Sequence, residues 1–253
     1  MGGVARSRTI WRLTPQAAVL LITAAIAWVA IITWSQQGGP MTGTMGLTLP
    51  AFLVAWTAMM AAMMLPSVAP VASLYARSIS GRRALRLTLF TIGYLVVWAS
   101  AGVIAFALGS LIAGLAEGDP RLGAAAGVAA YLGCGLYQLS PLKYRCLAHC
   151  RSPLSLFFHY SSYQGLLRDL RVGVHHGAYC LGCCWGLMVV LLALGAMSVV
   201  PMLILATVVI TEKLWSKGEA FSRLVGVACL GLAVATIWMP GLAPGFMTSM
   251  PSM

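Results

Sequence analysis

Long apolar runs without charge alternate along the chain with short blocks that carry basic residues. A helix needs about 20 apolar residues to cross the roughly 30 Å hydrocarbon core of a bilayer, and most of these runs approach or exceed that length. The pattern therefore predicts membrane-spanning helices over residues 17–34, 47–76, 88–116, 122–142, 174–194, 199–215 and 221–239.

The division between the fifth and sixth predicted spans lies inside one uncharged stretch, residues 177–211. This stretch is long for one span and short for two. Gly195, Ser198 and Pro201 fall in its middle, where residues of these types favour a tight turn. We therefore expect about seven helices, whereas a single span here would leave six.

The composition excludes a water-soluble fold. Hydrophobic residues make up 60% of the chain and charged residues 8%, whereas about 25% of the residues in soluble domains are charged. We expect an all-α protein, a polytopic transmembrane helix bundle that forms a single domain over residues 1–253.

The basic residues predict the orientation of this bundle. With the N-terminus in the cytoplasm, 15 of the 16 Lys and Arg residues fall on the cytoplasmic side, and only Arg121 lies outside. An excess of basic residues in short cytoplasmic loops sets membrane topology. This distribution also explains the net charge of +11 without nucleic acid, which we do not expect as a partner.

Residues 152–171 form the one long internal loop of this topology. Apolar Leu154, Phe157 and Leu166 are mixed there with Arg168 and Asp169. This mixture is typical of an amphipathic helix that lies at the membrane interface, within a cytoplasmic loop.

Cysteines cluster in two places that the topology brings to one membrane depth. Cys180, Cys183 and Cys184 share one face of a helix, because residues three and four apart are neighbours there. Cys146 and Cys150 directly follow the fourth span, with His149, a further candidate metal ligand, between them and basic residues around them. Nearby cations favour the thiolate, which is the form that binds metal. Packing of small residues between helices is the alternative.

A methionine-rich face lies in the middle of the second span. Trp56 falls on the same arc of the helix as its methionines, which are Met59, Met60, Met63 and Met64. Thioethers are neutral, soft ligands that suit Cu(I) without bringing charge into lipid. Methionine as an apolar filler is the competing interpretation. Pro66 follows, and a proline frees a backbone carbonyl one turn earlier.

Three further polar or sulfur features are ambiguous in the sequence. Glu212 is either a metal ligand or the ion-pair partner of its neighbour Lys213 at the headgroup level. His175 and His176 stand one turn before Cys180, where either could complete a metal shell or be solvated. Two more cysteines are solitary in the sequence and are expected to pack, namely Cys134 and Cys229.

The ligand types select a soft ion. Cysteine and methionine with few carboxylates favour Cu(I) first, then zinc or an iron–sulfur cluster. Structural zinc accepts four cysteines, and the chain could supply Cys146, Cys150, Cys180 and Cys183. Zinc gives no role to the methionine face, so copper is the preferred ion and zinc remains possible.

At these residues the chain resembles a bacterial family of predicted metal-binding integral membrane proteins, catalogued as a domain of unknown function. The family includes proteins described as copper chaperones for copper enzymes such as tyrosinase. The resemblance is carried by the W-T-A-M-M-A-A-M-M-L-P run at 56–66, Y-Q-L-S-P-L-K at 137–143 with Cys146 and C-R-S-P at 150–153, the cysteine run at 180–185, and T-E-K at 211–213. It implies metal binding, copper handling and a multi-pass location in the bacterial cytoplasmic (inner) membrane.

The preferred hypothesis is a Cu(I) chaperone or relay, without enzymatic activity, that exchanges copper with a donor or recipient protein. A membrane thiol–disulfide oxidoreductase using Cys180 and Cys183 is the runner-up, although the cytoplasmic face is reducing. A structural or assembly subunit stapled by zinc is the third reading.

Overall fold

The computed structural model describes residues 15–37, 44, 46–77, 81–151, 167–195 and 198–246. These residues form eight α-helices and two short 3₁₀ helices and contain no strand, which confirms the all-α prediction. In chain order the elements are α1 (Pro15–Gln37), α2 (Leu49–Arg77), α3 (Arg83–Gly118), α4 (Pro120–Gln138), α5 (Pro141–Arg151), α7 (Arg168–Leu194), α8 (Val199–Leu214), α9 (Gly218–Trp238), η2 (Pro240–Leu242) and η3 (Pro244–Phe246).

Five of these helices are long and apolar enough to cross a membrane: α1, α2, α3, α7 and α9. Helices α4 and α5 would form a sixth span if the pair, which is bent by 65°, counts as one. Helix α8 has 16 residues, fewer than the about 20 that a perpendicular span needs. The described residues thus give five or six candidate spans, and the count of seven is not confirmed.

The fourth predicted span is wrong at its end. Residues 122–142 were expected to form one helix, but α4 ends at Gln138 and α5 begins at Pro141. Proline has no backbone N–H and disfavours helical geometry in the residue before it, so it starts a helix more readily than it continues one. The bend turns α5 toward α7, which it contacts.

The predicted interfacial segment lies mostly outside the described residues, which leave out 152–166. Its last part is corrected, because Arg168 to Arg171 belong to the first turn of α7. Asp169 is buried there, accepts a hydrogen bond from the Tyr75 hydroxyl and pairs with Arg86 at 3.0 Å. A carboxylate that is held by α2 and α3 anchors this turn inside the bundle.

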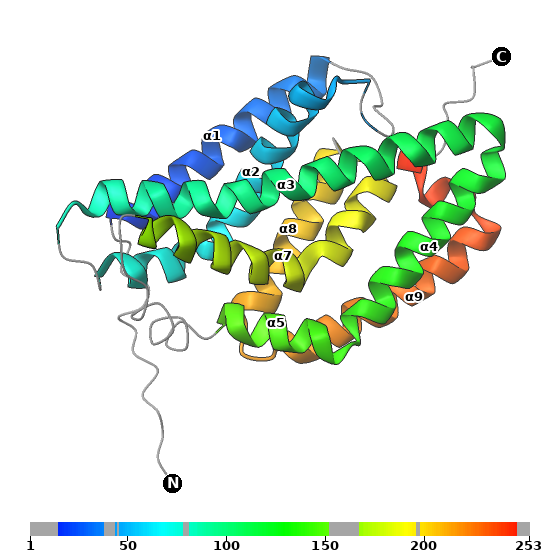
Figure 1. The fold of residues 1–253 in the computed structure, drawn as a ribbon. Coiled ribbons are helices and arrows are strands. Elements are labelled where there is room, and N and C mark those ends of the chain that lie inside the picture. The colour runs from blue at the N-terminus through cyan, green and yellow to red at the C-terminus, as the bar shows by residue number, and fades with distance from the viewer. Residues whose placement is uncertain are drawn as a thin grey trace, which may run out of the picture.

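Helix α2 lies at the centre of the bundle, with α1, α3 and α8 packed against it (Figure 1). Seventeen of its 29 residues are buried. Pro66 inside the helix leaves the carbonyl of Ala62 without its usual partner. The indole N–H of Trp28 on α1 donates to that carbonyl at 3.1 Å, so the freed group is satisfied by a neighbouring helix.

Helices α3 and α7 approach each other closely because glycines face each other across the contact (Figure 1). A Cβ on Gly173 would lie 2.0 Å from the carbonyl oxygen of Phe90, and one on Gly93 would lie 2.3 Å from that of Leu170. Small residues allow such backbone contact between membrane helices. The contact sets Tyr94 of α3 against Cys180 of α7.

Large apolar side chains cover the outer faces of α1, α3, α4 and α9, including Val19, Ile26, Ile104, Leu136 and Val227. Soluble monomers rarely expose apolar patches larger than a few hundred Å². Such a surface suits contact with lipid tails, in agreement with the predicted membrane bundle.

We predict that Gly173→Val separates α3 from α7 and destabilises the protein by about 1–3 kcal/mol, as overpacking of a close contact does. The unfolding temperature in detergent would fall by several degrees. Gly114→Val on α3 is the control, because no atom lies within 4 Å of a Cβ at that position. Equal unfolding temperatures for the two variants would contradict the role given to the glycine contact.

Candidate metal centre

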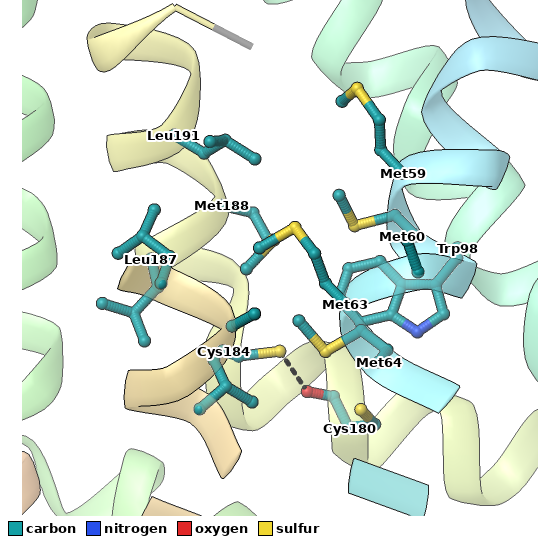
Figure 2. Close-up of a cluster of buried hydrophobic side chains, with 14 of the residues drawn as sticks. Met59, Met60, Met63, Met64, Trp98, Cys180, Cys184, Leu187, Met188 and Leu191 are labelled. Atoms are coloured by element: carbon teal, nitrogen blue, oxygen red, sulfur yellow. Dashed lines mark hydrogen bonds between the residues drawn. The ribbon is translucent and has the colours of Figure 1, made fainter. Parts of the chain in front are cut away.

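Three cysteines of α7 turn their side chains into the bundle. Cys180, Cys183 and Cys184 are all buried, which confirms that they share one inward face. The thiols of Cys183 and Cys184 donate to the backbone carbonyl of Cys180, at 3.1 and 2.9 Å. The three residues share one side of α7 within about one turn of helix, and the sulfur of Cys184 points toward the methionines of α2 (Figure 2).

Helix α5 adds the second cysteine pair at the same level. Cys150 is buried, and its thiol lies beside that of Cys183. Cys146 is half-buried and lies over Gly182, where a Cβ would be 3.0 Å from its sulfur. The predicted convergence of the two cysteine sets is therefore confirmed, and the bend before Pro141 is what makes it possible.

The methionines of α2 face the cysteines of α7 (Figure 2). Met64 lies beside Cys184, and Met63 reaches toward Met188 of α7 in the same space. Met60 and Met59 continue the row away from the thiols. We call the central group the sulfur cluster; its members are Cys150, Cys180, Cys183, Cys184, Met63, Met64 and Met188.

A buried lysine touches the sulfur cluster. The ammonium group of Lys213, on α8, donates to the sulfur of Cys180 at 2.9 Å and to the hydroxyl of Ser67 at 3.1 Å. The Tyr94 hydroxyl lies 3.0 Å from the same sulfur. From the sequence we expected Lys213 at the headgroup level, so this role was not predicted. Its position in the last turn of a predicted span was the available clue, because charged groups inside spans are usually functional.

Glu212 does not pair with its neighbour Lys213, because adjacent residues point about 100° apart on a helix. Its carboxylate accepts hydrogen bonds from Lys143 at 2.7 Å and from Gln138 at 2.9 Å. Lys143 also donates to the carbonyl of Cys183. This buried ion pair joins α4, α5, α7 and α8 directly beside the sulfur cluster.

The structure separates the histidines that the sequence left equivalent. His176 is buried between the rings of Phe90 and Tyr94. Its Nδ1 atom makes no hydrogen bond to any residue that the structure describes. His175 instead contacts His149, and His149 stacks on the ring of Tyr179 with 3.7 Å between ring centroids. His176 is therefore the histidine on the inner side of α7.

The sequence suggested that Cys134 and Cys229 are solitary, but the structure places them next to each other. Their sulfur atoms lie 3.8 Å apart across the contact of α4 and α9, and both residues are buried. They form a second thiol pair, from two helices that contribute no member to the sulfur cluster.

The cluster adjoins an apolar cavity of about 400 Å³. Trp56, Trp98, Leu181, Trp185 and Met188 are part of its lining. Apart from Met188, this lining offers no soft ligand, so the cavity suits hydrocarbon better than an ion.

The thiols are close together but are not arranged around one point. In the described parts of the chain, no three His, Cys, Asp or Glu side chains are placed to hold one metal ion. A four-ligand zinc site of the structural kind therefore finds no support here.

We predict that Glu212→Gln destabilises the protein by about 3 kcal/mol or more, because it leaves the Lys143 charge buried without a counter-charge. The double variant Lys143→Met/Glu212→Gln should recover most of that loss, since it removes both charges. Denaturation in detergent with urea measures both. A double variant as unstable as Glu212→Gln would show that the ion pair is not the cause.

The comparisons with known proteins agree with this chemistry. A family model, PpoB2, described as a copper chaperone, matches residues 53–236, which include the whole sulfur cluster, the Lys143–Glu212 pair and Lys213. No curated protein and no solved structure matches the chain. The match covers most of the chain and confirms the copper-chaperone part of the resemblance seen in the sequence. The chain belongs to the PpoB2 copper chaperone family.

Proposed function

We propose that this protein is an integral membrane copper chaperone that carries Cu(I) in the sulfur cluster and exchanges it with a partner protein. Membership of a copper chaperone family supports the metal. Thiolates and thioethers are the protein ligands that favour Cu(I), and no carboxylate is needed for such a site.

One observation carries the proposal: the cysteine run of α7 and the methionine face of α2 meet in the same buried space (Figure 2). A packing role for cysteine alone, or for methionine alone, does not require the two sets to face each other. A structural zinc site would leave the thioethers without a role, whereas Cu(I) binds both thiolates and thioethers. The contact therefore supports copper over the zinc-stapled alternative.

Graded exposure of the sulfur atoms gives the ion a path. Cys146 is half-buried while the other six cysteines are buried, so its thiol is the first that a partner protein would meet. From there the ion would pass to Cys150 and Cys183, which lie side by side, and on to Cys180, Cys184 and the thioethers of Met63 and Met64. Each step is an exchange of one soft ligand for another.

His149 and Glu212, which we predicted as ligands from sequence, have lesser parts in this scheme. Glu212 balances the charge of Lys143, and His149 stacks beside Cys150 on α5. Met59 and Met60 extend the thioether row beyond the cluster (Figure 2). His176 joins the scheme instead, because its unbonded Nδ1 faces the interior one turn before Cys180.

The finer membrane assignments belong to the same proposal. We place the N-terminus in the cytoplasm of a bacterial cell, because that orientation puts 15 of 16 basic residues on the inside. The cysteines of α5 then lie toward the cytoplasmic face, where a copper-donating or copper-receiving protein would dock. Helix α8 completes a seventh, short crossing.

Replacing Cys146, Cys150, Cys180, Cys183 and Cys184 by Ser should abolish copper binding, because no thiolate would remain in the cluster. We expect about one copper per native chain and only traces in the variant, measured by mass spectrometry of metals on protein purified anaerobically under reducing conditions. Cys134→Ser/Cys229→Ser is the matched control and should keep its copper. Copper that remains bound after the fivefold replacement would overturn the proposal. Zinc in the native chain would favour the alternative of a structural subunit held together by zinc.

Replacing Met63, Met64 and Met188 by Leu should weaken Cu(I) binding by about tenfold while the fold persists, since Leu conserves the volume of Met. Competition with a Cu(I) chelator measures the affinity. Met239→Leu is the control, because Met239 is exposed at the end of α9. Unchanged affinity in the triple variant would show that the thioethers only fill space.

A further inference from the structure

Among the described residues, every buried charged side chain except Lys213 has an oppositely charged partner. Lys143, Asp169, Glu212 and Lys213 are the buried charged residues in the described ranges. Lys143 pairs with Glu212, and Asp169 pairs with Arg86. Lys213 forms no ion pair with a carboxylate there, and its contacts are with Cys180 and Ser67.

An unmatched ammonium in an apolar bundle is costly, and it favours an arrangement with one negative charge beside it. Metal-binding cysteines are thiolates. Two thiolates with Cu(I) carry one net negative charge, which a single ammonium cancels. Two thiolates with a divalent ion such as Zn(II) are already neutral, so the ammonium would be left uncompensated.

Within the described residues, the geometry limits the thiolates around one ion to two at most. No three His, Cys, Asp or Glu groups in the described segments are placed around one ion. Cys180 has Lys213 at 2.9 Å, and the neutral thioethers of Met63 and Met64 lie in the same buried space, on the side of Cys184 and Met188 (Figure 2). Neutral ligands complete the shell without changing its charge.

We propose that Lys213 is the residue that makes this site selective for a monovalent soft ion over a divalent one. The inference rests on the proposed copper function and names the source of its specificity. Lys213 acts through charge beside the ion and is not itself a ligand. Among the described residues, no lysine is hydrogen-bonded to the second thiol pair, Cys134 and Cys229, which should not show this preference.

Two substitutions, made one at a time, remove the net positive charge that Lys213 brings to the site. Lys213→Met deletes the ammonium and keeps the side-chain length. Ser67→Asp puts a carboxylate in place of the hydroxyl that now lies 3.1 Å from the ammonium. Each should lower the ratio of Cu(I) affinity to Zn(II) affinity by at least about tenfold. Lys213→Arg and Ser67→Asn are the matched controls that keep the charge, and both should retain the native ratio.

The test is competition of each variant, in detergent and under anaerobic conditions, with chelators for Cu(I) alone and for Zn(II) alone. Lys217→Met, on the exposed turn between α8 and α9, controls for general loss of positive charge. A merely structural role for Lys213 would change both affinities together and leave the ratio intact, which would overturn the inference. A native ratio that favours Zn(II) would overturn it as well. A native protein that binds no copper would instead contradict the proposed function.

Discussion

A charged group inside this bundle has little water to solvate it, so it depends on a partner within the protein. That constraint organises the contacts around the sulfur cluster. The Lys143–Glu212 pair joins four helices beside the thiols, and Asp169 holds the start of α7 to α2 and α3 through Tyr75 and Arg86. Lys213 differs because its partner is a sulfur atom. The same electrostatic rule therefore accounts both for how the helices are tied together and for why a thiol site would hold an ion of a particular charge.

The cluster also depends on two backbone features that carry no chemistry themselves. Glycines at the contact of α3 and α7 let the two helices approach until Tyr94 reaches Cys180. The bend ahead of Pro141 turns α5 so that Cys150 reaches Cys183. A straight fourth span would carry Cys146 and Cys150 away from α7. In the relay that we propose, helix packing places the soft ligands, and their exchange requires only that each sulfur lies near the next.

Local patterns were a good guide wherever one helix holds the whole feature. The shared face of Cys180, Cys183 and Cys184 follows from helical spacing, as does the inward methionine row of α2, and both are buried as expected. The errors arose where two helices must be placed relative to each other. Cys134 and Cys229 are separated by 95 positions and touch only because α4 packs along α9. Glu212 pairs with Lys143 on α5 and not with its neighbour Lys213, since adjacent residues in a helix point in different directions.

By itself the sequence determined the class of protein, the approximate positions of the long helices and the chemistry of the candidate ligands, because apolar run length, helical spacing and residue type are local properties. Only the tertiary structure decided which sulfur atoms meet, which histidine faces the interior, and that the buried ammonium of Lys213 lies against a thiol while Lys143 is neutralised by Glu212. These outcomes depend on helix crossing and on the bend between α4 and α5. The physical reason is that packing and charge pairing between distant segments leave no periodic mark in either segment alone.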